Sequence, residues 1–91
     1  MIIYRKKEGL LTRKIANENI IVETDNGFCH VMNNVGSIVW DNLDDKCIED
    51  IIKAVENVVE VPAEGKGIIE SDTKEYVGLL LEKGLIIQQE I

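Results

Sequence analysis

The chain changes character in one stretch near its middle, which reads Val31-Met32-Asn33-Asn34-Val35-Gly36-Ser37-Ile38-Val39-Trp40-Asp41-Asn42-Leu43. Asn33 and Asn34 stand where either amide can accept from the free N–H groups that open a helix. Apolar residues then recur at the i, i+3, i+4, i+8 spacing of one helix face, at Val35, Ile38, Val39 and Leu43. The stretch therefore predicts a junction between preceding strands and a helix over 34–43.

The residues before this junction have the pattern of strands. Residues 20–24 are β-branched almost throughout, and Asp25-Asn26-Gly27 supplies the positive φ angles of a hairpin turn. Residues 28–32 then return as a second arm that has apolar groups on both faces. One face of this strand would pack on the core, and either a ligand or the protein's own loops would cover its other face. A further strand is predicted over 10–16, followed by a turn at 17–19, and residues 1–4 either add an edge strand or fray.

The residues after the junction have the pattern of helices. A second helix starts at Asp45 or Cys47, and its apolar residues follow helical spacing from Ile48 onward. Residues 60–67 contain the only proline and predict a loop. Ser71 or Asp72 is expected to cap a third helix that stops at Gly84, and residues 85–87 predict a last short strand. This order predicts an α+β domain.

Composition narrows the class of protein. The chain has 91 residues, enough for one domain over 1–91, and its formal charge of −7 disfavours binding to nucleic-acid phosphates. Cys29, Cys47 and His30 are too few for a structural metal site, so no metal and no cofactor are expected. The sequence shows no signal peptide and no apolar run of membrane-spanning length, which predicts a soluble cytoplasmic protein without a membrane partner.

Signatures of enzymes are missing from the sequence. It has no phosphate-binding glycine loop after a strand and no nucleophile-elbow motif. Cys29 and His30 are neighbours on a predicted strand, so their side chains point to opposite faces and do not form a thiol–imidazole pair. We therefore expect a binding protein and no enzyme.

Gly78 lies in the middle of the third predicted helix, where glycine costs about 1 kcal/mol relative to alanine. Such a glycine is useful where another backbone or a bulky side chain approaches the helix. The approaching group is either a bound partner or a strand of the protein itself. Lys74, Gly78 and Leu81 share one helical stripe that would face this group.

Two segments together resemble a known family. The first reads Met-Asn-Asn-Val-Gly-Ser-Ile-Val-Trp over 32–40, and the second reads Asp-Thr-Lys-Glu-Tyr-Val-Gly-Leu-Leu-Leu-Glu-Lys-Gly-Leu-Ile over 72–86. Their order and separation resemble the PqqD-like family, which comprises the peptide chaperone of pyrroloquinoline quinone biosynthesis and the recognition elements of ribosomal peptide modification. The chain departs mildly from the family pattern at Met32, Thr73, Tyr76 and Val77, and its loop over 60–69 is longer.

The resemblance implies a winged-helix-like domain with a three-stranded antiparallel sheet followed by a three-helix bundle. Members of the family bind the leader region of a precursor peptide as an added strand and present it to a modifying enzyme, often a radical S-adenosylmethionine protein. Carried over to this chain, the implied peptide-binding residues are Gly27, Phe28, Cys29, His30, Val31, Met32, Lys74, Val77, Gly78 and Leu81. Backbone pairing would supply the affinity, and pockets beside it the specificity.

Two other functions stay open from the sequence. One is a small winged-helix regulator that binds DNA, which the negative charge and the scarcity of basic residues on the third helix both disfavour. The other is an accessory subunit of an enzyme whose chemistry lies on another chain.

Overall fold

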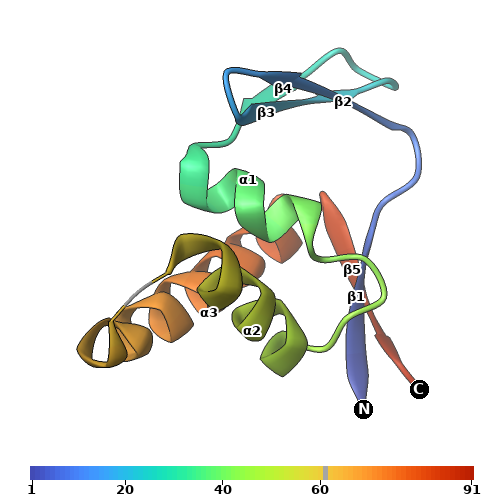
Figure 1. Ribbon diagram of the computed structural model, residues 1–91. Helices are drawn as coiled ribbons and strands as arrows, with labels where there is room; N and C mark the ends of the chain where they lie inside the picture. Colours follow the sequence, from blue (N-terminus) through green and yellow to red (C-terminus); the bar gives the residue numbers. More distant parts are fainter. Residues whose placement is uncertain (61) are drawn as a thin grey trace.

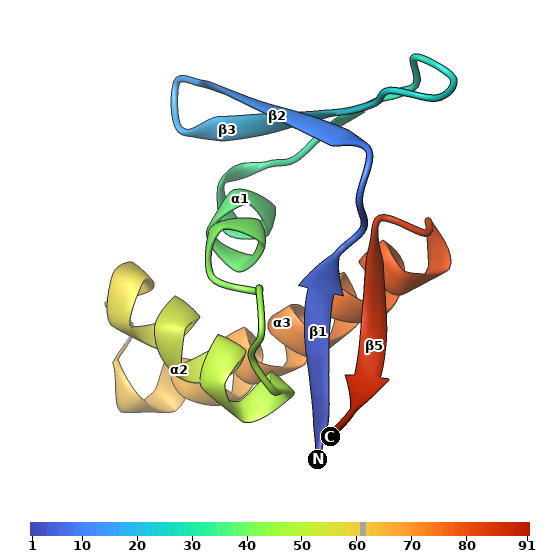
Figure 2. The ribbon, with the colours of Figure 1, turned by 90° about the vertical axis from the view of Figure 1, so that its right-hand side faces the viewer.

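The computed structural model describes residues 1–60 and 62–91, with a three-stranded sheet above three helices and a separate two-stranded sheet beside them (Figures 1 and 2). The elements are β1 (Ile2–Lys6), β2 (Leu10–Ile15), β3 (Glu18–Glu23), β4 (Cys29–Val31), α1 (Asn34–Asp41), α2 (Ile48–Val59), the 3₁₀ turn η1 (Ala63–Gly65), α3 (Lys66–Glu82) and β5 (Ile86–Glu90). The predicted α+β class, with a three-stranded antiparallel sheet and three helices, is confirmed. Its description as winged-helix-like stays a prediction.

The three-stranded sheet has the order β2-β3-β4 and is antiparallel throughout. Gly27, at a φ of 76°, lies in the predicted hairpin between β3 and β4. The turn before β3 lies at Ala16 and Asn17, which carry positive φ angles, so it starts one residue and ends two residues earlier than the predicted turn over 17–19. Asn19 instead belongs to β3, where it is fully buried against α1. Contacts with a distant helix thus override the turn propensity of its side chain.

Helix α1 lies between this sheet and the other two helices (Figure 1). Its predicted cap is confirmed, since Asn33 Oδ1 accepts a hydrogen bond of 2.8 Å from the Gly36 N–H. Val39, Trp40 and Leu43 are buried in the core, which they share with α2, α3 and β3. Of the apolar positions predicted from the spacing, Val39 and Leu43 are thus buried, whereas Val35 and Ile38 are only partly buried.

Helix α3 begins five residues before the predicted Ser71. The predicted loop over 60–67 is correspondingly wrong, because η1 and the first turn of α3 occupy most of it; Val61 lies outside the described residues. Ile69 is buried in the core, and this packing favours helix ahead of Ser71. Ser71 and Asp72 are therefore exposed residues inside α3, and neither caps it.

The C-terminal end of α3 follows the prediction. Gly84 has a φ of 73°, and the Leu85 N–H donates to the Leu80 carbonyl at 3.0 Å. The chain then forms β5, which pairs antiparallel with β1 so that the two termini lie side by side (Figure 2). Residues 1–4 thus belong to a strand, and its partner is the other end of the chain.

Candidate functional site

Strand β4 has a free edge. It is the last strand of the three-stranded sheet, with β3 on one side and no strand of the described residues on the other. The Met32 N–H donates to the Asn19 carbonyl and the Glu23 N–H to the Phe28 carbonyl, both at 2.9 Å. Because bonded and non-bonded positions alternate in an antiparallel pair, Cys29 and Val31 direct their N–H and C=O groups away from β3. These groups are available to an additional strand.

The two edges of the sheet differ in how they discourage pairing. β2 carries Arg13 and Lys14, charged residues of the kind that protect sheet edges from other strands. β4 carries neither lysine nor arginine, and the neighbouring side chains of Phe28 and Val31 are 65% and 69% exposed. By its charge the β4 edge is the less protected of the two, although β2 also exposes apolar side chains at positions 11 and 15.

A cleft of about 670 Å³ opens beside the end of β4. One wall is the start of α1, and the other is the outward face of α3. Its lining residues are Asn33, Val35, Asp72, Glu75, Tyr76, Gly78, Leu79 and Glu82. The lining combines apolar groups from both walls with three carboxylates from α3. The α1 wall follows β4 closely in the chain, since Asn33 comes two residues after the end of β4.

β4 and α3 do not pack directly against each other. Both elements are fully described, and no Cα of one lies within 8 Å of a Cα of the other. A strand added to a sheet lies about 4.8 Å from its neighbour. A strand added at the open edge of β4 would therefore break no contact between β4 and α3.

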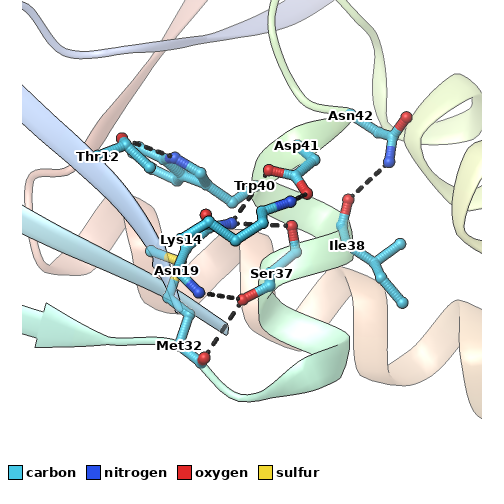
Figure 3. A network of polar contacts seen from close by, with 9 residues as sticks. All are labelled: Thr12, Lys14, Asn19, Met32, Ser37, Ile38, Trp40, Asp41 and Asn42. Atoms are coloured by element: carbon cyan, nitrogen blue, oxygen red, sulfur yellow. Dashed lines mark hydrogen bonds and ion pairs between the residues drawn. The ribbon is translucent and has the colours of Figure 1, made fainter. Parts of the chain in front are cut away.

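A buried polar network holds α1 against the sheet (Figure 3). The Asn19 N–H donates to Ser37 Oγ at 2.7 Å, and the Asn19 amide donates to Asp41 Oδ1 at 3.0 Å. Ser37 Oγ in turn donates to the Met32 carbonyl at 3.3 Å, directly after β4. Since α1 supplies one wall of the cleft, these bonds fix that wall relative to the β4 edge.

The electrostatics of Asp41 follow from the same network. Partial burial acts to raise the pKa of this carboxyl. Hydrogen bonds from Lys14 and Asn19 outweigh that effect and hold the pKa below its usual value. Asp41 is therefore a charged acceptor that ties β2 and β3 to α1.

His30 contacts Glu23 across the β3–β4 pair, with Nε2 and Oε2 2.7 Å apart. This hydrogen bond lowers the pKa of Glu23. Both side chains are about one-fifth exposed. The pair is thus a polar contact at the sheet edge, and the predicted divergence of Cys29 and His30 agrees with their different surroundings.

The ten residues implied by the resemblance lie in three different places. Phe28, Cys29 and Val31 are exposed at the β4 edge, next to the hairpin residue Gly27 and the half-buried His30. Met32 and Val77 are each 2% exposed and belong to the core, so their side chains offer almost no surface to a ligand. Of the α3 residues implied by the resemblance, only Gly78 lines the cleft. Lys74 pairs with Glu70 at 3.0 Å, and Leu81 packs against the core.

Of the two alternatives for Gly78, close packing against a strand of the protein itself is not observed among the described residues. A β-carbon built at Gly78 meets no described atom within 4 Å. The glycine that makes room for a neighbour is Gly36, whose β-carbon would collide with the ring of Tyr76. The outward stripe of α3 is also rotated from the predicted one and runs through Asp72, Glu75, Tyr76, Leu79 and Glu82. Their i, i+3, i+4, i+7, i+10 spacing was readable in the sequence, but the side of the helix was not.

Other kinds of site find little support in the described part of the chain. No group of three histidine, cysteine or acidic side chains there is placed to hold a metal ion, and both cysteines are free. None of the described helices is long and apolar enough to cross a membrane. The site that the structure offers is an open strand edge beside a cleft, a geometry suited to an extended peptide.

Comparison with known proteins shows the family to which this domain belongs. The family model described as "Coenzyme PQQ synthesis protein D (PqqD)" matches residues 18–86, and the chain belongs to this family. A solved structure described as TbiB1 in complex with the TbiA(beta) leader peptide has a similar fold, with a TM-score of 0.74, 22% sequence identity, and coverage of 90% of this chain and 93% of the other. No curated protein sequence matches the chain at a significant level.

Proposed function

We infer that this protein binds the leader region of a ribosomally made precursor peptide and presents it to a separate modifying enzyme. The observation that carries the proposal is the free edge of β4, where Cys29 and Val31 direct their backbone groups away from β3 and no strand of the described residues pairs with them. Membership in the PqqD family supports it, as does the likeness to a fold solved with a leader peptide. The protein acts by binding and performs no chemical step itself.

The peptide lies antiparallel or parallel to β4 and pairs with the backbone of Cys29 and Val31. Backbone pairing supplies affinity that depends little on peptide sequence, and side chains beside the edge select among peptides. Pairing also covers an edge that would otherwise favour aggregation. The modifying enzyme, for which the resemblance suggests a radical S-adenosylmethionine protein, then receives the peptide in an extended form.

An NMR titration of isotope-labelled protein tests this function. The titrant is the leader segment of a precursor peptide encoded beside the gene. We expect saturable shifts at Phe28–Val31, at Asn33–Val35 and on the outward face of α3. Saturable shifts confined to other regions would reject this site but keep peptide binding. Absence of peptide binding, combined with binding to duplex DNA at moderate salt, would favour the regulator instead.

A further inference from the structure

Two kinds of side chain line the cleft: apolar ones, called its floor below, and acidic ones, called its rim. Its floor consists of Val35, Tyr76 and Leu79, of which Leu79 is 41% exposed. Burial raises the pKa of the Tyr76 hydroxyl, as expected for a ring held in apolar surroundings. The site itself is defined by the strand edge and the cleft, and the rim adds information about the occupant.

The rim consists of Asp72, Glu75 and Glu82, and no lysine or arginine of the described residues lines the cleft. None of the three carboxylates takes part in an ion pair within the described chain. Glu70, on another side of α3, is by contrast paired with Lys74. The cleft therefore presents three negative charges that have no ion-pair partner among the described residues.

Lysine and arginine can contact both the apolar and the acidic residues that line the cleft. Each has an apolar stem that can lie along apolar surface and a cationic head that stays at its polar margin. An acidic side chain would be repelled by the rim, and a purely aliphatic one would contact only the apolar part of the lining. A β-carbon at Gly78 would meet no described atom within 4 Å, so nothing blocks entry of a long stem.

We propose that the peptide bound at β4 places a lysine or arginine in this cleft, with its stem on Val35, Tyr76 and Leu79 and its charge facing Asp72, Glu75 and Glu82. This assignment rests on the proposed peptide-binding function and adds the residue class that gives it specificity. The attraction is electrostatic, so it weakens as ionic strength rises.

Selection from random dodecapeptides displayed on phage tests the proposal without assuming a leader sequence. We expect the selected peptides to share one basic residue next to aliphatic residues. Their affinity is then measured by fluorescence anisotropy for the wild type and for the triple variant Asp72→Asn, Glu75→Gln, Glu82→Gln. The loss of three partly solvated ion contacts should weaken binding about tenfold.

A second triple variant controls for net charge. Glu8→Gln, Glu49→Gln and Glu64→Gln remove three exposed carboxylates that neither line the cleft nor form an ion pair within the described chain. This variant should bind the selected peptides with nearly the affinity of the wild type. The change in net charge should alter the affinity for every basic peptide by the same small amount. Equal effects of the two triple variants would overturn the proposal.

NMR separates this inference from the proposed function. Selected peptides that shift β4 but lack a shared basic residue would overturn the cation assignment and keep strand addition. Selected peptides that leave β4 unshifted would overturn both. Shifts at β4 together with a basic residue and selective weakening by the cleft variant would support both.

Discussion

The ring of Tyr76 on α3 occupies the space where a side chain at Gly36 on α1 would begin. This contact joins the two walls of the cleft, because Tyr76 lines it and Gly36 immediately follows the lining residue Val35. A β-carbon at position 36 must push the ring aside. The distance between the walls therefore depends on the absence of a side chain at one residue.

Gly36→Ala should destabilise the protein by about 1 to 3 kcal/mol, the usual cost of overpacking. Urea denaturation followed by circular dichroism measures this loss. If the ring of Tyr76 is the cause, the cost should largely disappear in a Tyr76→Ala background, because contacting residues are energetically coupled. An equal cost in both backgrounds would assign the effect to something other than this contact.

Gly78→Leu should weaken peptide binding while the fold stays intact. The new side chain enters the cleft, and the free energy of unfolding should not fall, because leucine favours helix over glycine by about 1 kcal/mol. Gly67→Leu is the matched control, since Gly67 is also in α3 with open space around it but does not line the cleft. Unchanged affinity in a folded Gly78→Leu variant would remove Gly78 from the site.

Val31→Pro should reduce peptide affinity about tenfold through the loss of one backbone hydrogen bond. The Val31 N–H faces away from β3, so the proline removes no bond within the sheet. Val31→Ala keeps the N–H and removes most of the exposed side chain. Anisotropy titrations of both variants distinguish backbone from side-chain recognition, and a larger loss with alanine would argue against strand addition.

Ser37→Ala should cost about 1 to 3 kcal/mol, because it leaves the buried Asn19 N–H without its hydrogen-bond acceptor. The comparison is Ser71→Ala, at an exposed position of α3, which should change the free energy of unfolding by no more than about 0.5 kcal/mol. Chemical denaturation of the two variants measures the difference. Similar values for both would mean that the network of Figure 3 contributes little to stability.

The contact between Glu23 and His30 predicts a pH dependence of stability. The hydrogen bond from His30 lowers the pKa of Glu23 in the folded state below its ordinary value of 4.5. The stabilisation is therefore fully present above about pH 4.5 and is lost as the pH falls through the lower folded-state pKa. Thermal unfolding between neutral and acidic pH should show this loss.

Replacing His30, the partner of Glu23, tests whether their contact makes the stability sensitive to acid. His30→Gln should reduce the loss of stability on acidification, since it removes the group that holds the Glu23 pKa down. The Asp41 carboxyl, whose pKa is also lowered, should give both proteins a common remaining acid dependence. Identical pH profiles would show that the His30 contact is not linked to stability.

The amino-acid sequence by itself determined the features that depend on neighbours in the chain. The cap at Asn33, the hairpin at Gly27 and the helix stop at Gly84 each arise from the backbone preferences of a few adjacent residues. Helical spacing also predicted Val39 and Leu43 of α1, which are buried, together with Val35, which lines the cleft. The order of these local features resembles one family, and this resemblance pointed to the sheet edge at residues 27–32 as the peptide-binding strand.

Only the tertiary structure decided the features that depend on distant residues. β1 finds its partner at the other end of the chain, and α3 starts early because Ile69 reaches the core. The roles of Gly36 and Gly78 are likewise set by what approaches them, which is Tyr76 in one case and open space in the other. Spacing shows which residues share a helix face, but packing across the fold determines which face borders the cleft and leaves three carboxylates on its rim.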